Sequence, residues 1–360
     1  MPTSATAEIP SGIDDLTPQW LTEVLRADHA LPATVTVTAL RAERIAEDSG
    51  FSSLLYRVHL SGDGVPPTLI AKFAAVSEAR GAMELLGGYR REVAYYRDVA
   101  GHAPMDSPHV YAAAIAPDSA DFVLLLEDLQ GWDNADHLAG LTLAQTRTCL
   151  AALAGLHAWS VTDAEPVSLQ AFPSIDTPIA RDLLVPAFAA GWDIYREHTE
   201  ARVPTAVARY AERFTDHAPT ALTALGERSM LLHGDIRADN LFFDGDRLKV
   251  VDFQFASRGC GAADVAYLVS QGLPTAVRSG HDEALVRDYL DHLTRGGVTD
   301  YAFDEAWRHY RVAVAYLIVL PVITLIGWDG LPQRSRELCL TLTDRAVAAI
   351  DETDALAVFG

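Results

Sequence analysis

Apolar residues occur in short runs over the first 130 residues of this chain and at helical spacing over most of the rest. Short apolar runs bounded by Gly, Pro, Ser and Asp predict strands, and residues 35–45, 54–60, 68–73 and 122–126 have this form. Apolar residues three or four positions apart predict helices. The clearest helices are residues 16–25, 89–100, 142–159, 181–196, 203–225, 281–293, 303–320 and 338–350, with another beginning near Ala262. Strands first and helices later indicate an α+β fold with two lobes.

Two more strands are predicted on either side of a tight turn. The runs at 241–243 and 248–251 flank residues 244–246, Asp-Gly-Asp, where Gly supplies the positive φ that tight hairpins need. Antiparallel pairing of these runs would place Asn240 within a residue or two of Asp252. An amide oxygen and a carboxylate facing the same gap suit Mg²⁺, which takes one or two carboxylates, several waters and substrate phosphates.

The spacing of Asp235, Asn240 and Asp252 resembles the catalytic and metal-binding segments of the protein-kinase-like superfamily. The His-Gly-Asp order at 233–235, and Gln254 after the second motif, look more like its small-molecule branch: the aminoglycoside phosphotransferase and choline kinase relatives, in particular the ecdysteroid-kinase-like group. The resemblance implies a small antiparallel-sheet N-terminal lobe and a larger, mainly helical C-terminal lobe. It also implies that Asp235 positions or deprotonates an acceptor hydroxyl while Asn240 and Asp252 hold Mg²⁺. Each residue alone would suit an ordinary cap or turn.

A lysine in an apolar strand and a glutamate on an apolar helix face suggest a second part of the site. Lys72 lies in the run 68–73, and Glu92 shares the apolar face of the helix predicted from Tyr89. A carboxylate on such a face is costly unless it is paired, and Lys72 is the natural partner. Glu78 and Glu84 are rival candidates for that pairing. In the superfamily this pair grips the α and β phosphates of ATP, so the resemblance implies an ATP site.

Two weaker features extend the nucleotide site. Gly50 lies in a turn of small residues at 48–53, which either covers the ATP phosphates with backbone N–H groups or is an ordinary hairpin turn. Glu127, Asp128 and Leu129 follow the strand at 122–126 and resemble the hinge between kinase lobes, where backbone groups hold the adenine edge.

Two further polar residues fall on helices. His157 lies on the buried stripe of the helix at 142–159, where a core histidine with a satisfied hydrogen bond is the expected interpretation. Asp264 opens the helix near Ala262; in the family a matching Asp braces the catalytic loop, whereas the alternative is a favourable charge in a first helical turn. Only twelve positions separate Asp252 from Asp264, which leaves no room for the long activation segment that protein kinases use to hold peptides.

Composition narrows the classes of partner. A net charge of −21 and a hydrophobic content of 49% exclude a wholly disordered chain and argue against nucleic-acid binding. The three scattered cysteines predict neither a disulfide framework nor a zinc site. The N-terminus does not have the form of a signal peptide, and a cytoplasmic enzyme is expected. Residues 312–328 are almost wholly apolar but contain Pro321, and we expect buried helices broken or kinked there rather than membrane insertion.

These features predict an ATP- and Mg²⁺-dependent kinase that phosphorylates a hydroxyl of a small molecule. Residues 1–129 would form the nucleotide-binding lobe, and residues 130–360 the lobe with the catalytic loop, metal site and acceptor pocket. The acidic balance favours an aminoglycoside or amino alcohol as acceptor. The ecdysteroid-kinase-like resemblance and the apolar segment favour a bulky apolar alcohol, which is the preferred of the two. The alternative function is a nucleotide-binding scaffold without turnover, and nucleotide preference and oligomeric state are left open.

Overall fold

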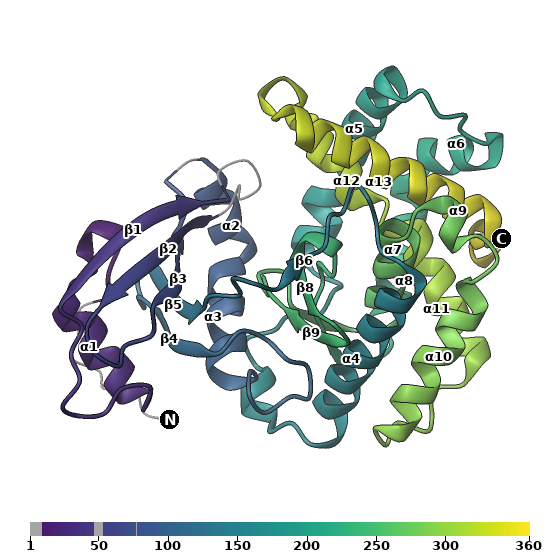
Figure 1. Ribbon diagram of the computed structural model, residues 1–360. Helices are drawn as coiled ribbons and strands as arrows, with labels where there is room; N and C mark the ends of the chain where they lie inside the picture. The colour runs from purple at the N-terminus through teal and green to yellow at the C-terminus, as the bar shows by residue number, and fades with distance from the viewer. Residues whose placement is uncertain (1–8, 47–52, 77) are drawn as a thin grey trace. The chain divides into compact units, whose positions relative to one another are not determined.

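The computed structural model describes residues 9–46, 53–76 and 78–360. The chain divides into two compact units, which we call the sheet unit (Met1–His102 with Ser107–Gly131) and the helical unit (Ala103–Asp106 with Trp132–Gly360). Figure 1 shows the long strands in the sheet unit and most of the helices in the helical unit. The predicted α+β class, with an antiparallel sheet in one unit and mainly helices in the other, is confirmed.

The sheet unit is built on a five-stranded antiparallel sheet of order β1-β2-β3-β5-β4. Its strands are β1 (Ala39–Ile45), β2 (Ser53–Ser61), β3 (Thr68–Ala74), β4 (Val110–Ile115) and β5 (Phe122–Glu127). Four of them match the predicted runs, and β1 begins at Ala39 rather than at residue 35. The edge strand β4 was not predicted, because its Val-Tyr-Ala-Ala-Ala-Ile sequence is rich in alanine, which strands disfavour.

Three helices complete the sheet unit: α1 (Pro18–Ala27), α2 (Glu78–Leu86) and α3 (Gly88–Asp98). Helix α1 begins two residues later than predicted, because the Thr17 hydroxyl accepts the Trp20 N–H at 3.1 Å and caps the helix there. Leu21 and Leu25 of α1 are fully buried in one hydrophobic cluster with residues of β2, β3 and β5. Helix α2 was not predicted, whereas α3 matches the helix expected at 89–100.

The helical unit contains two small sheets. One has the order β6-β8-β9, made of β6 (Asp133–Asn134), β8 (Leu241–Asp244) and β9 (Arg247–Val250). The other pairs β7 (Met230–Leu232) with β10 (Ser257–Gly259). The predicted hairpin is confirmed: β8 and β9 pair antiparallel with Leu241 opposite Val250, and Gly245 in the turn has a φ of 59°.

Helices make up the rest of this unit. They are α4 (Leu143–Thr162), α5 (Val185–His198), α6 (Thr205–Glu212), α7 (Phe214–Leu225), α8 (Ala262–Gly272), α9 (Thr275–Arg278), α10 (Asp282–Arg295), α11 (Phe303–Tyr316), α12 (Val319–Thr324) and α13 (Gln333–Glu352). The helix predicted at 203–225 is two helices that meet at Arg213. Thr142 caps α4 in a capping box with Gln145.

The apolar segment near residue 320 forms two helices, as predicted. Helix α11 ends at Tyr316 and α12 begins at Val319, because Pro321 has no N–H to donate to the carbonyl of Leu317. That carbonyl accepts a hydrogen bond from Nε2 of Gln271 at 3.1 Å instead. By length and composition alone Phe303–Gly330 would pass as a membrane span, but 61% of its most apolar window is buried in the fold. Core helices pass the same test.

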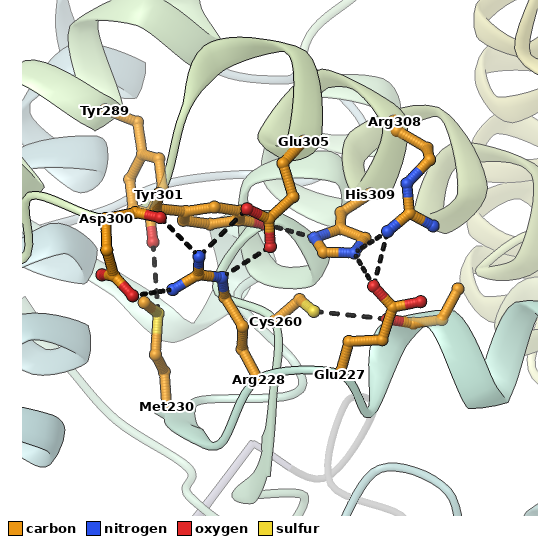
Figure 2. A network of polar contacts seen from close by, with 11 residues as sticks. Glu227, Arg228, Met230, Cys260, Tyr289, Asp300, Tyr301, Glu305, Arg308 and His309 are labelled. Carbon is orange, nitrogen blue, oxygen red and sulfur yellow. Dashed lines mark hydrogen bonds and ion pairs between the residues drawn. The ribbon is translucent and has the colours of Figure 1, made fainter.

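A polar cluster fastens the end of α7 to α11 (Figure 2). The Arg228 guanidinium donates to both carboxylate oxygens of Glu305, at 2.9 and 3.0 Å, and to the backbone carbonyl and side chain of Asp300, at 2.7 and 3.3 Å. It also lies 4.2 Å from the centroid of the Tyr301 ring. Beside it, His309 contacts Tyr301 at 2.8 Å and Glu227 at 3.0 Å. Every guanidinium nitrogen of Arg228 therefore has a partner.

Candidate functional site

Strand β7 delivers the predicted catalytic loop. Leu231 and Leu232 are buried, and His233 after them is fully buried. Gly234 has a φ of 80°, and a Cβ added to it would lie 2.2 Å from the carbonyl oxygen of Phe255. Only glycine fits this position, which explains the His-Gly-Asp order.

Asp264, in the first turn of α8, braces this loop. Its Oδ2 accepts the backbone N–H of His233 at 2.7 Å, and its Oδ1 accepts that of Gly234 at 2.9 Å. Both interpretations of Asp264 therefore hold, since it lies in a first helical turn and also contacts the loop. Burial alone would raise the pKa of Asp264, but hydrogen bonds from His157 and the loop hold it below its ordinary value.

His157 is a core residue, as predicted. It is fully buried, with Nδ1 2.9 Å from the Tyr289 hydroxyl and Nε2 3.2 Å from Oδ2 of Asp264. Both ring nitrogens thus have partners within the helical unit. The histidine supports the brace and is not placed to act on a ligand.

Asp235, Asn240 and Asp252 are brought together at the end of the β8–β9 hairpin. Nδ2 of Asn240 donates to the backbone carbonyl of Asp235 at 2.9 Å, and it lies 3.4 Å from Oδ2 of the same residue. The backbone N–H of Val251 donates to the carbonyl of Asn240 at 3.0 Å, so Asp252 is the next residue along. Asp252 has a φ of 68°, a left-handed conformation that aspartate tolerates better than most residues.

The Asp235 side chain is 13% exposed and lies against charged and polar neighbours. Burial raises its pKa above the ordinary value; the positive charge of Arg237 opposes this and the negative charge of Asp252 adds to it. The hydroxyl of Tyr267 on α8 donates to its Oδ1 at 3.2 Å. A carboxylate with a raised pKa is a better proton acceptor than an exposed one.

The donor atoms of this group fit Mg²⁺. Asn240 directs its amide nitrogen at Asp235, which turns Oδ1 away from it, and Asp252 adds a carboxylate; both are hard oxygen ligands. Within the described ranges no cluster of three or more His, Cys, Asp or Glu side chains is arranged to hold a metal. Mg²⁺ needs no such cage, because water and substrate phosphates complete its coordination.

The predicted pairing of Lys72 with Glu92 is present in the sheet unit. Nζ of Lys72 on β3 lies 2.7 Å from Oε1 of Glu92 on α3, and the two side chains are 7% and 1% exposed. Of the rivals, Glu84 is exposed, and the side chain of Glu78 is outside the described residues. The carboxylate on the apolar helix face is thus paired as the burial argument requires.

The remaining predicted nucleotide-site residues follow β5. The Asp128 carboxylate accepts two hydrogen bonds from Arg57, at 2.7 and 3.2 Å, and the Glu127 side chain accepts the His109 N–H at 3.0 Å. Their side chains are thus engaged within the sheet unit, and Leu129 is buried. A hinge role would therefore use the backbone, as predicted. Gly50 lies outside the described residues.

Sequence reasoning missed two residues beside Asp235. Arg237, in the same loop, places Nε 3.4 Å from Oδ2 of Asp235. Tyr267 follows Asp264 by one helical turn, so the two lie on the same face of α8 and both reach the loop. The helical spacing after Asp264 was a usable signal for Tyr267. Because Arg237 follows the predicted base by only two residues, its position indicated a positive charge near Asp235.

Comparisons with known proteins were made for sequence and for structure. The sequence model of the ecdysteroid kinase-like family matches residues 48–297, which is more than half of the chain. Methylthioribose kinase of Geobacillus thermodenitrificans is 33% identical over 85 residues, covering 23% of this chain and 21% of that protein. The chain thus aligns with about a fifth of the length of this curated relative.

Three solved structures share the fold over most of both chains. Ethanolamine kinase of Plasmodium vivax has a TM-score of 0.55 at 11% identity, covering 90% of this chain and 85% of that one. The GDP complex of aminoglycoside 2'-phosphotransferase-IIIa has a TM-score of 0.54 at 15% identity, covering 92% and 99%. A choline/ethanolamine kinase family protein from Mesorhizobium loti has a TM-score of 0.50 at 18% identity, covering 94% and 99%.

Proposed function

This chain belongs to the ecdysteroid kinase-like family, and we propose that it transfers the γ-phosphoryl group of ATP, with Mg²⁺, to a hydroxyl of a small molecule. The observation that carries the proposal is the meeting of Asp235, Asn240 and Asp252 at one hairpin end, on a loop braced by Asp264. Phosphoryl transfer needs positioning and charge neutralisation more than covalent chemistry, and these residues supply both.

Asp235 is the proposed catalytic base. Its raised pKa suits it to orient the acceptor hydroxyl and to accept its proton as the oxygen attacks the γ-phosphorus. Asn240 and Asp252 would hold Mg²⁺, which neutralises charge on the phosphates when it is bound. The brace from Asp264 fixes the loop backbone, so that Asp235 does not have to be ordered again in each turnover.

The nucleotide would be held by the sheet unit. Lys72, fixed by Glu92, is proposed to contact the α and β phosphates; the backbone of 127–129 would hold the adenine edge, and Gly50 the phosphates. That an aminoglycoside phosphotransferase of similar fold has been solved with GDP supports a purine nucleotide site. A cytoplasmic location, where ATP is available, accords with this proposal.

The test is the Asp235→Asn variant, assayed for ATP-dependent phosphorylation across a panel of hydroxylated metabolites and antibiotics. We expect kcat to fall by about 10²- to 10⁴-fold, the usual contribution of a general base. Nucleotide affinity should stay within about threefold, because the amide keeps the shape of the side chain. Full activity of this variant would refute the assignment.

The matched control is Asp246→Asn, at the exposed turn of the β8–β9 hairpin. It removes one carboxylate charge at the far end of the hairpin that carries Asn240 and Asp252, and should leave activity unchanged. ATP binding by the wild type without product from any acceptor would instead favour the nucleotide-binding scaffold.

A further inference from the structure

The Arg237 side chain, beside the proposed catalytic base, is 27% exposed. Its Nε is buried, and among the described residues no group accepts a hydrogen bond from it. Oδ2 of Asp235 lies 3.4 Å from this nitrogen, an ion-pair distance without hydrogen-bond geometry. The negative charge of Asp235 raises the pKa of Arg237, so the side chain remains a cation.

Arginines that serve the fold of this chain are held by close hydrogen bonds to carboxylates. Arg278 also has a buried Nε without a partner among the described residues, but its two other nitrogens donate to carboxylates at 2.7 Å. Arg57 makes two hydrogen bonds to Asp128, at 2.7 and 3.2 Å, and Arg181 makes two to Asp176, at 2.5 and 2.6 Å. Such bidentate geometry is the usual way in which a guanidinium satisfies a carboxylate. If Arg237 only offset the charge of Asp235, the same geometry would be expected there.

A buried histidine, His137, is also incompletely hydrogen-bonded. It is 1% exposed, and its ring nitrogens make no hydrogen bond of standard geometry among the described residues, although the backbone of Gln271 is close enough to raise its pKa slightly. Burial lowers its pKa to about 3, and the positive charges of Arg237 and Arg345 contribute. Its backbone N–H donates to Oδ1 of Asp239 at 3.0 Å, which ties it to the catalytic loop. Buried polar atoms without a partner occur elsewhere in the described residues too, so it is the position of these two at the catalytic loop, and not their number, that suggests a place for a ligand or water.

We propose that Arg237 binds an oxyanion of the acceptor, so that the acceptor is a small alcohol with a carboxylate or comparable anionic group close to the phosphorylated hydroxyl. This rests on the proposed function, because Asp235 is taken to receive that hydroxyl. The guanidinium fork matches a carboxylate in shape and charge. Since Nε lies 3.4 Å from Oδ2 of Asp235, the hydroxyl and the oxyanion must be only a few bonds apart in the acceptor.

This inference runs against the substrate suggested by net charge. The chain carries −21 overall, which would draw cationic alcohols toward it over long distances. Contact at the site is decided by the nearest groups, and an ammonium group beside Arg237 would be repelled. Local charge therefore favours hydroxy acids over amino alcohols.

The test uses sets of acceptors with one carbon skeleton, each as the hydroxy acid, the hydroxy amide and the amino alcohol. The wild type is expected to prefer the acid. In Arg237→Gln, kcat/KM for the acid should fall by about 10- to 100-fold, mainly through KM, as for loss of a hydrogen bond to a charged group. The amide should change by less than about threefold, and Arg237→Lys should keep part of the preference for the acid.

Arg147→Gln is the matched control, because Arg147 is a half-exposed arginine of α4 paired with Asp288 at 2.9 Å. It should leave the acid preference intact. The γ-phosphoryl group is the other oxyanion that Arg237 could meet. If Arg237→Gln lowers kcat equally for acid and amide with acceptor KM unchanged, Arg237 acts on the γ-phosphoryl group or through Asp235, and the acceptor assignment is wrong.

A binding measurement separates this inference from the proposed function. Without nucleotide, each hydroxy acid should raise the melting temperature of the wild type but not that of Arg237→Gln, with circular dichroism used to show that both are folded. Acids that bind through Arg237 without phosphate transfer would overturn the kinase proposal and leave the anion site standing. Phosphorylation of amides and amino alcohols as readily as acids, with no acid-dependent shift, would overturn the anion site alone.

Discussion

Two arginines of the helical unit show how differently the same side chain is used. Arg228 has a partner on each of its nitrogens and stacks on Tyr301 (Figure 2). Arg237 lies beside Asp235 with a buried Nε that no described residue accepts. Partners within the chain hold the first in a single geometry. The second has a buried donor that the proposed acceptor would satisfy.

An empty cavity beside Arg228 does not by itself indicate an anion-binding site. A cavity of about 370 Å³ opens beside Arg228, lined by residues of α4, β7 and the loop before α11. Its cation is already matched by Glu305 and Asp300, so little charge is left to recruit an anion.

The largest effect is expected at Asp264, whose two carboxylate oxygens both accept backbone hydrogen bonds. Asp264→Ala removes the acceptor for the backbone N–H groups of His233 and Gly234 and leaves Nε2 of His157 without its partner. Breaking a buried pair by removing one member costs about 3–5 kcal/mol, so the unfolding free energy should fall by that amount in urea titration. A loss below about 1 kcal/mol would contradict the brace, since even one buried unsatisfied group costs that much.

Lys72 differs from both arginines, because it is paired with Glu92 within the chain and is also proposed to bind phosphate. Lys72→Met should lower kcat about a hundredfold, as for loss of one preorganised charged donor. Steady-state kinetics with saturating acceptor would measure this. Unchanged kcat would mean that the Lys72–Glu92 pair only supports the sheet unit, as the Arg228 cluster supports the helical unit.

Substitution of Arg228 should affect mainly stability, and substitution of Arg237 mainly activity. Arg228→Gln leaves Glu305 and Tyr301 without their cation, and should lower the unfolding free energy by about 1–2 kcal/mol without changing kcat/KM. Arg237→Gln removes an ion pair at 3.4 Å but no hydrogen bond, and should lower the unfolding free energy by less than Arg228→Gln does. Urea titration of both variants, with kinetics alongside, makes the comparison direct. Loss of stability in Arg237→Gln together with loss of activity in Arg228→Gln would contradict both assignments.

The smallest effect concerns pH. Hydrogen bonding to Arg228 lowers the pKa of Glu305 below its ordinary value of 4.5 in the folded chain. A carboxyl whose pKa is lowered by folding contributes stability above its unfolded pKa, and this is lost as pH falls through the folded pKa. Stability of the wild type should therefore decline below about pH 4.5, and Arg228→Gln should decline less steeply over this window. Parallel curves for the two proteins would exclude a contribution from this pair.

Local rules of sequence predicted much of this structure. The Gly245 turn placed Asn240 near Asp252, because a short hairpin fixes its own register. Burial of a carboxylate on α3 predicted the Lys72–Glu92 pair, because an unpaired one would be too costly. These features depend on residues close in sequence or on one strong energetic demand.

Other features depend on packing that single segments do not encode. The edge strand β4 owes its conformation to pairing with β5, since its own sequence does not favour a strand. The contact of Tyr267 with Asp235 depends on how α8 lies against the catalytic loop. The unmatched state of Arg237 is a property of all its neighbours together, so no spacing along the chain reports it.

The most direct test of the central claim follows the γ-phosphate of labelled ATP in the presence of Mg²⁺ and a panel of hydroxylated small molecules that includes hydroxy acids. The account predicts that the wild-type protein transfers the label to an organic acceptor and that Asp235→Asn does not. Label that stays in ATP, or appears only as inorganic phosphate with every acceptor, would contradict it.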